Sequence, residues 1–156
     1  MSPIDEYLHA IIDRAGQEAH DDGSSAVEAH HLLLAVAAQP EPVVGPLLHD
    51  AGLDRQAVHD ALRREYEHSL STVGVNLASF DLAPPTRTPK RSLKIGATAK
   101  GVLERGFATA RKKDLRPAHL LLAILRIQNG TVPRALAIAG VDTTALVERV
   151  SRTVGA

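Results

Sequence analysis

The segment His31-Leu-Leu-Leu-Ala35 recurs letter for letter as His119-Leu-Leu-Leu-Ala123, 88 residues further along the chain. The same offset continues without a gap, so that Ala51-Gly52 corresponds to Ala139-Gly140. A self-similar period of this length is typical of two copies of one supersecondary unit that bury their apolar faces together. The chain is therefore an internal duplication, and one pseudo-symmetric domain is the simplest interpretation.

The composition favours an all-α fold. The chain has 156 residues, which suits one compact domain. Hydrophobic residues make up 44% of it but aromatic residues only 3%. A core built from leucine, isoleucine, valine and alanine suits closely packed helices better than a sheet.

Charge and cysteine content exclude several classes of protein. Lysine plus arginine number 18, as do aspartate plus glutamate, so no overall field attracts nucleic acid or an anionic membrane. The chain has no cysteine, which suits a reducing compartment. The N-terminus has no secretory pattern, and no apolar run approaches the ~18 residues of a membrane span. We therefore expect a cytoplasmic protein that binds neither nucleic acid nor membrane.

Apolar spacing predicts the helices of the first unit. Residues at three- and four-residue intervals predict a helix over Ile4–His20, and a second helix carries His31–Ala38. This second helix ends before Pro40, because proline disfavours helical geometry in the residue that precedes it. A short third helix is predicted over Val43–Asp50, and a fourth follows it.

The turn before each fourth helix has the same chemistry in both units. Gly52 and Gly140 can adopt the left-handed conformation that ends a helix. Asp54 and Asp142 can then accept hydrogen bonds from the free N–H groups of the helix that follows.

A similar succession of helices is predicted for the second unit. Before the repeated block, the offset between matching residues of the two units is 91 instead of 88, which places the first of these helices at Ala97–Lys112. The units are therefore residues 4–70 and 95–154 of one domain that spans 1–156. Between them, residues 71–94 contain three prolines and several basic residues, and we interpret them as an irregular linker.

No motif demands catalysis, a metal or a cofactor. The string Gly96-Ala-Thr-Ala-Lys-Gly101 is followed by Val102 instead of the lysine and hydroxyl residue of a phosphate-binding loop. Seven of the eight histidines lie in the first half, without zinc-ligand spacing. His31 and His119 open equivalent buried helices, where an imidazole bonded to a neighbouring backbone group is the common case. We therefore expect a protein that is not an enzyme.

The paired block, the short helix after it and the Gly-Leu-Asp or Gly-Val-Asp turn resemble the double Clp N-terminal domain, which precedes the ATPase rings of ClpA- and ClpC-type unfoldases. The resemblance covers about Ile4–Val154. It implies eight helices in two pseudo-twofold-related four-helix repeats. It also implies a role in recognising substrates, adaptor proteins and, in some members, cyclic-peptide antibiotics. Since the chain stops at Ala156 without ATPase modules, we expect a stand-alone binding module.

The resemblance implies two binding regions. In ClpC-type members a glutamate before each paired histidine helps to hold phosphoarginine, but this chain has His30 and Ala118 there, which speaks against that ligand. The second region lies where the first helices of the two repeats meet, and it binds adaptors and cyclic peptides. Its matching positions here are Met1, Ile4, His9 and Ile12 from the first repeat and Ile95, Lys100, Leu103 and Glu104 from the second. For Ile12 and Leu103, ordinary core packing is an equal alternative.

Three functions remain open. The first is a non-enzymatic module that binds Clp protease components, adaptor proteins, peptides or cyclic-peptide ligands, and so modulates or protects Clp-dependent proteolysis. The second is a decoy that sequesters Clp-targeting cyclic-peptide antibiotics, and the third is the N-terminal fragment of a full Clp ATPase. A composition rich in alanine and arginine hints at a bacterial source.

Overall fold

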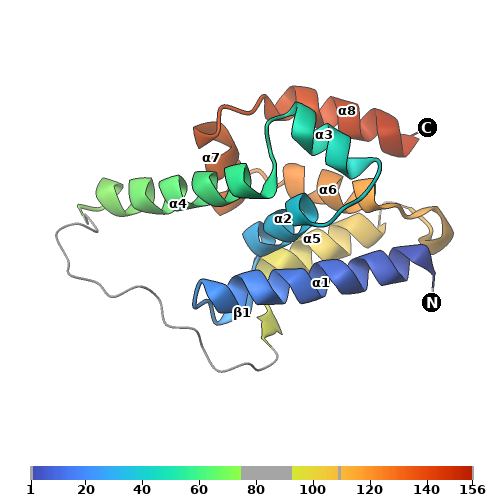
Figure 1. The fold of residues 1–156 in the computed structure, drawn as a ribbon, viewed down its shortest axis with the longest axis horizontal. Helices are drawn as coiled ribbons and strands as arrows, with labels where there is room; N and C mark the ends of the chain where they lie inside the picture. The colour runs from blue at the N-terminus through green and yellow to red at the C-terminus, as the bar shows by residue number, and fades with distance from the viewer. Residues whose placement is uncertain (1, 75–92, 109, 156) are drawn as a thin grey trace.

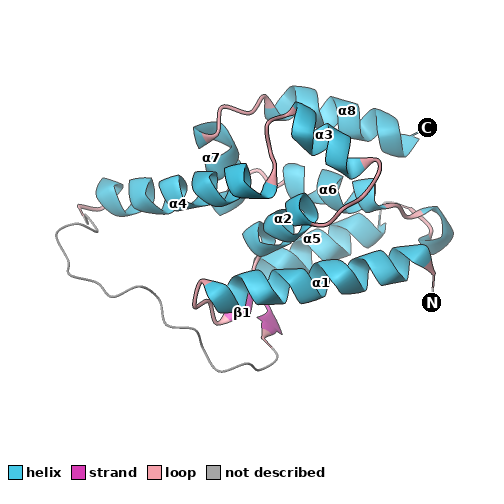
Figure 2. Ribbon diagram, viewed as in Figure 1, coloured by secondary structure: helices cyan, strands magenta, loops and turns pink. Residues whose placement is uncertain are grey.

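The computed structural model describes residues 2–74, 93–108 and 110–155, which contain eight α-helices (Figure 1). The first repeat holds α1 (Pro3–Asp21), α2 (Ala29–Ala38), α3 (Val44–Asp50) and α4 (Arg55–Thr72). The second repeat holds α5 (Ala97–Ala108), α6 (Pro117–Leu125), α7 (Thr131–Ile138) and α8 (Thr143–Gly155). The described strands are two-residue segments, β1 (Ala26–Val27) and β2 (Lys94–Ile95) (Figure 2). The predicted all-α class with eight helices is confirmed.

The repeated block forms the two central helices. α2 and α6 lie in the middle of the molecule, with α1 and α5 along one side and α3 and α8 along the other (Figure 1). In each copy the three leucines are buried, and Leu32, Leu33 and Leu121 are at most 1% exposed. Burying one such side chain contributes about 1.5–3 kcal/mol. These helices are apolar on nearly every face because helices cover them on several sides.

Helix contacts obey the pseudo-twofold relation between the repeats. α1 packs on α2 as α5 packs on α6, and α2 contacts α4 as α6 contacts α8. Contacts between repeats come in matching pairs as well: α2 with α5 and α6 with α1, then α3 with α8 and α7 with α4. The repeats therefore share one core.

Caps and glycines set the helix boundaries. The Ser2 hydroxyl accepts a hydrogen bond from the Asp5 N–H at 3.3 Å, which caps α1. Asp54 caps α4 through the Ala57 N–H at 2.7 Å. Gly52 and Gly140 have φ of 73° and 75°, the left-handed geometry that the sequence predicts for both turns.

Some boundaries differ from the predicted ones. α5 ends at Ala108, so its predicted extension to Lys112 is wrong, and Lys112–Asp114 forms a separate 3-10 turn. The Lys112 ammonium lies 3.4 Å from the Asp5 carboxylate of α1, which draws this turn toward the other repeat. α4 runs to Thr72 and β2 begins at Lys94, inside the linker predicted over 71–94. Residues 75–92 of that linker lie outside the described residues.

The two short strands join the repeats. β1 and β2 pair in parallel, with Ala26 opposite Lys94 and Val27 opposite Ile95. Next to them, the Gly96 N–H donates to the Val27 carbonyl at 2.7 Å. Segments of two residues are too short to show an alternating pattern, so periodicity could not have predicted them.

The described helices include none that is both long and apolar enough to cross a bilayer.

Candidate functional site

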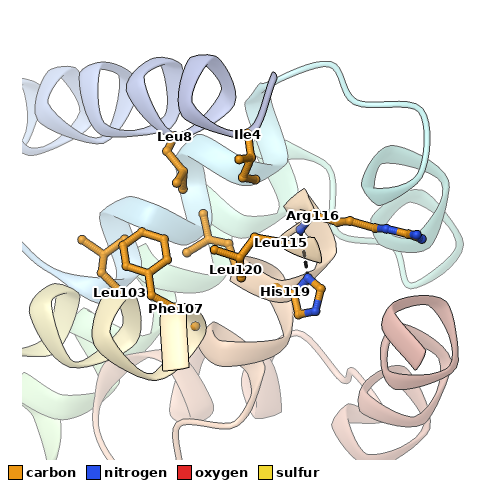
Figure 3. A pocket seen from close by; sticks show the side chains of 9 residues that line it. Ile4, Leu8, Leu103, Phe107, Leu115, Arg116, His119 and Leu120 are labelled. Atoms are coloured by element: carbon orange, nitrogen blue, oxygen red, sulfur yellow. Dashed lines mark hydrogen bonds between the residues drawn. The ribbon is translucent and has the colours of Figure 1, made fainter. Parts of the chain in front are cut away.

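An apolar groove opens where the N-terminal half of α1, the C-terminal half of α5 and the start of α6 meet (Figure 3). Its lining consists of Ile4, Leu8, Leu103, Gly106, Phe107, Leu115, Arg116, His119 and Leu120. Figure 3 shows Ile4 and Leu8 pointing from α1 toward Leu115 and Leu120. We call this feature the α1–α5–α6 groove.

The spacing of apolar residues on two helices builds the walls of the groove. Ile4 and Leu8 are four residues apart on α1, and Leu103 and Phe107 are four apart on α5, so each pair shares one helix face. Ile4, Leu8 and Leu103 are half-buried against the core, whereas Phe107 remains 45% exposed. The groove therefore has a packed floor and an accessible aromatic rim.

The structure brings only part of the predicted binding surface into this groove. Ile4 and Leu103 line it, and Leu103 also packs against the core. Ile12 and Ile95 lie outside it and are 37% and 39% exposed, so Ile12 is not an ordinary core residue.

The predicted polar positions lie at the surface. The Lys100 ammonium is 4.0 Å from the Glu104 carboxylate, and both side chains are mostly exposed. His9 is also exposed. Met1 lies outside the described residues.

The paired histidines fix the starts of α2 and α6. His31 Nδ1 accepts the Glu28 N–H, and His119 Nδ1 accepts the Arg116 N–H, each at 2.9 Å. Since Nδ1 of His31 accepts, its ring proton sits on Nε2, which donates to the Asp22 carboxylate at 2.8 Å. Although burial raises the pKa of Asp22, hydrogen bonds from His31 and Ser24 outweigh burial and lower it.

One cluster in the described chain has the composition of a metal site. Ligand atoms of Asp22, His30 and His31 lie within 4.8 Å of one another. Both nitrogens of His31 are already used, however, because Nδ1 accepts a backbone N–H and Nε2 carries a proton. A metal at Nε2 would require moving that proton to Nδ1, opposite the Glu28 N–H. The arrangement fits a structural hydrogen-bond network better than a metal centre.

His30 is neutral at physiological pH. Burial, together with the adjacent His31, lowers the pKa of His30 to about 4. The position where ClpC-type members carry a glutamate is therefore uncharged in the first repeat. Its counterpart, Ala118, is buried at 2% exposure.

Several groove residues were not among the predicted binding positions, namely Leu8, Gly106, Phe107, Leu115, Arg116, His119 and Leu120. The four-residue spacing of the apolar pairs on α1 and α5 could have indicated Leu8 and Phe107. Nothing local in the sequence indicates Leu115 and Arg116, because their place in the groove depends on how the repeats pack.

Comparisons with known proteins agree with this architecture. The chain matches the Clp repeat (R) N-terminal domain family over residues 4–113, more than two thirds of its length. No curated protein matches the chain in sequence.

Two solved structures share the fold. The N-terminal domain of the caseinolytic protease associated chaperone ClpD from Arabidopsis thaliana is 20% identical, with a TM-score of 0.64 over 95% of this chain and 94% of that one. The Hsp104 N-terminal domain from Candida albicans is 17% identical, with a TM-score of 0.58 over 92% of this chain and 85% of that one. The family match ends before the second His-Leu-Leu-Leu-Ala block, but these structures extend the likeness over α6 to α8. The chain thus belongs to the Clp repeat (R) N-terminal domain family.

Proposed function

We propose that this chain is a non-enzymatic protein-binding domain that holds apolar peptide segments on the surface formed by α1 and α5. The observation that carries this proposal is the exposure of large apolar side chains on or next to these two helices. Among the described residues, six large apolar side chains are exposed, and three of them, Ile12, Ile95 and Phe107, lie on or next to these two helices. Burying such side chains against an apolar peptide would favour binding. Lys100 and Glu104 of α5 add an exposed pair of opposite charges to this surface.

Membership of the Clp family supports a role in Clp-dependent proteolysis. The peptide segments would come from Clp protease components, adaptor proteins or protease substrates. Such a domain would modulate proteolysis by occupying or presenting these segments.

A peptide array tests the proposal. The purified domain is incubated with overlapping peptides that tile an unfolded model protein, and bound domain is quantified for each peptide. Replacing Ile12 and Ile95 together by aspartate should lower binding of the apolar peptides about tenfold, because it places charge in the contact.

Val43→Asp is the matched control, since Val43 is 46% exposed at the start of α3 and away from this surface. It should bind like the wild type, and circular dichroism should show all three proteins folded. The proposal would be refuted if the wild type bound no peptide, or if the Ile12 and Ile95 double variant bound peptides as well as Val43→Asp does.

A further inference from the structure

The C-terminal end of α4 extends past α2 and α7, the helices on which α4 packs (Figure 1). The buried residues of α4 are Val58, Ala61 and Glu65, all in its first part. After Glu65, every residue of α4 up to Thr72 is exposed or half-buried. The end of α4 therefore buries little surface against the described part of the chain.

This projecting end carries a line of apolar side chains, which we call the α4 stripe. Its members recur at intervals of four, four and three residues and so share one helix face: Leu62, Tyr66, Leu70 and Val73. Tyr66 is 57% exposed and Val73 is 73% exposed, and the two leucines are half-buried. The stripe lies beside the buried face, because Tyr66 directly follows the buried Glu65 and successive residues turn by about 100°.

One charge of each sign borders the α4 stripe on the same flank. Arg63 directly follows Leu62, and Glu67 directly follows Tyr66, so both charges lie on the flank away from the buried face. They form an ion pair at 3.3 Å, and their side chains are 74% and 48% exposed. A complementary occupant presents an apolar line with the same two charges in the reverse order. A second copy of α4 that runs in the opposite direction has this pattern.

We infer that the α4 stripe is the interface of a twofold-symmetric dimer, in which the α4 helices of two copies pack antiparallel and cross at Tyr66. In this pairing, Leu62 lies level with Leu70 of the second copy. Arg63 lies within about 3 Å, along the helix axis, of the level of Glu67 of the second copy. The symmetry forms this ion pair twice. The antiparallel direction also keeps the two domains at opposite ends of the helix pair, because each domain packs on the first part of its own α4.

The interface is small, so the dimer is a weak one. We expect it to bury less than about 1,200 Å², the lower limit for stable complexes, and to have a dissociation constant on the order of 100 µM. The inference does not depend on the proposed peptide surface, because that surface lies on α1 and α5. A failure of either idea leaves the other standing.

The test is sedimentation equilibrium of the full chain at concentrations from about 10 µM to about 1 mM. The wild type should form a dimer, and Tyr66→Asp should weaken the dimer about tenfold or more, because it places two negative charges at the crossing point. Since Tyr66 is exposed, this substitution leaves the core intact, which circular dichroism checks. Val43→Asp is the matched control at an exposed apolar residue of another surface, and it should dimerise like the wild type.

Exchanging the charges tests the direction of the pairing. Arg63→Glu alone and Glu67→Arg alone should each dimerise about tenfold more weakly than the wild type, because each places like charges opposite one another twice. An equimolar mixture of these two variants should associate about as well as the wild type. In the mixture, the two carboxylates of the first variant meet the two guanidinium groups of the second.

A wild type that stays monomeric at about 1 mM would overturn the inference. A mixture of the two charge variants that associates no better than its components would do the same. A dimer that survives Tyr66→Asp but is lost in Ile12→Asp would place the contact on α1, and this result would also overturn it.

Discussion

Replacing Arg134 by alanine should destabilise the whole domain, because this residue holds a buried carboxylate of the other repeat. Arg134 of α7 donates from Nε to the Glu65 carboxylate of α4 at 2.8 Å. The Glu65 side chain is 6% exposed and that of Arg134 is 56% exposed. The Ser69 hydroxyl donates to the same carboxylate at 2.7 Å. Without the Arg134 guanidinium, the charged Glu65 carboxylate stays buried beside the Ser69 hydroxyl.

The cost lies between two known limits. Removing one partner of a fully buried ion pair costs about 3–5 kcal/mol, whereas an exposed pair is worth about 1 kcal/mol or less. Since the carboxylate is buried and the guanidinium half-exposed, we expect a loss of about 2 kcal/mol in the free energy of unfolding. With a urea m-value of about 2 kcal/mol/M, the unfolding midpoint should fall by about 1 M.

The loss should depend on pH. Burial raises the pKa of Glu65, but hydrogen bonds from Arg134 and Ser69 outweigh burial and lower it from 4.5. A lowered pKa in the folded state adds stability that is complete above the unfolded pKa and disappears as pH falls through the folded one. Wild type and variant should therefore differ at pH 7, and the difference should shrink as pH falls below 4.5.

The assay is urea unfolding followed by circular dichroism at pH 7 and at a series of pH values below 4.5. Arg149→Ala is the matched control, because Arg149 also bridges the repeats, to Asp50 at 3.0 Å, but both side chains are substantially exposed. It should cost less than about 0.5 kcal/mol. Equal costs for the two variants, or an Arg134→Ala cost that does not fall as pH decreases below 4.5, would refute the reasoning.

Three further predictions concern the junction around α2. His31→Ala should cost about 3 kcal/mol in thermal denaturation, because the imidazole is fully buried and hydrogen-bonded through both nitrogens. His119→Ala should cost about 1 kcal/mol, because that imidazole is half-buried. Equal costs for the two variants would contradict this prediction. Gly96→Ala should cost about 1–2 kcal/mol, because its Cβ would clash with the Glu28 carboxylate. In a double-mutant cycle, Glu28→Ala should remove most of this cost, and strict additivity would show that the contact is unimportant. The wild type should lose stability as pH falls from about 6.5 to 4, because burial lowers the folded pKa of His30 from 6.5 to about 4 and the unfolded state binds the proton first. His30→Asn should reduce this loss. An NMR titration midpoint of His30 near 6.5 would disprove the prediction.

The repeat made most of the fold predictable. Its apolar blocks indicate two central helices, and the turn residues Gly52 and Asp54 have the predicted roles at the end of α3 and the start of α4. These signals are local, since a cap or a left-handed turn depends on a few neighbouring residues. The length of α5 was harder to predict, because alanine and lysine after Ala108 suit a helix as well as a turn.

The candidate site was less predictable, for a physical reason. The β1–β2 pair and the position of Leu115 depend on how the repeats meet, and no periodicity within two residues encodes such a contact. From the sequence alone, Ile12 could lie in the core or at the surface. In the structure its side chain is 37% exposed, so it lies at the surface.

NMR mapping tests the central claim, that the surface of α1 and α5 binds apolar peptides, most directly. The domain is labelled with nitrogen-15 and titrated with an apolar peptide that binds on the array while its amide shifts are recorded. We predict that the largest changes occur at Ile12, Ile95 and Phe107. Saturating changes that gather instead around Val43 or Tyr66, the exposed apolar residues of other surfaces, would contradict the claim.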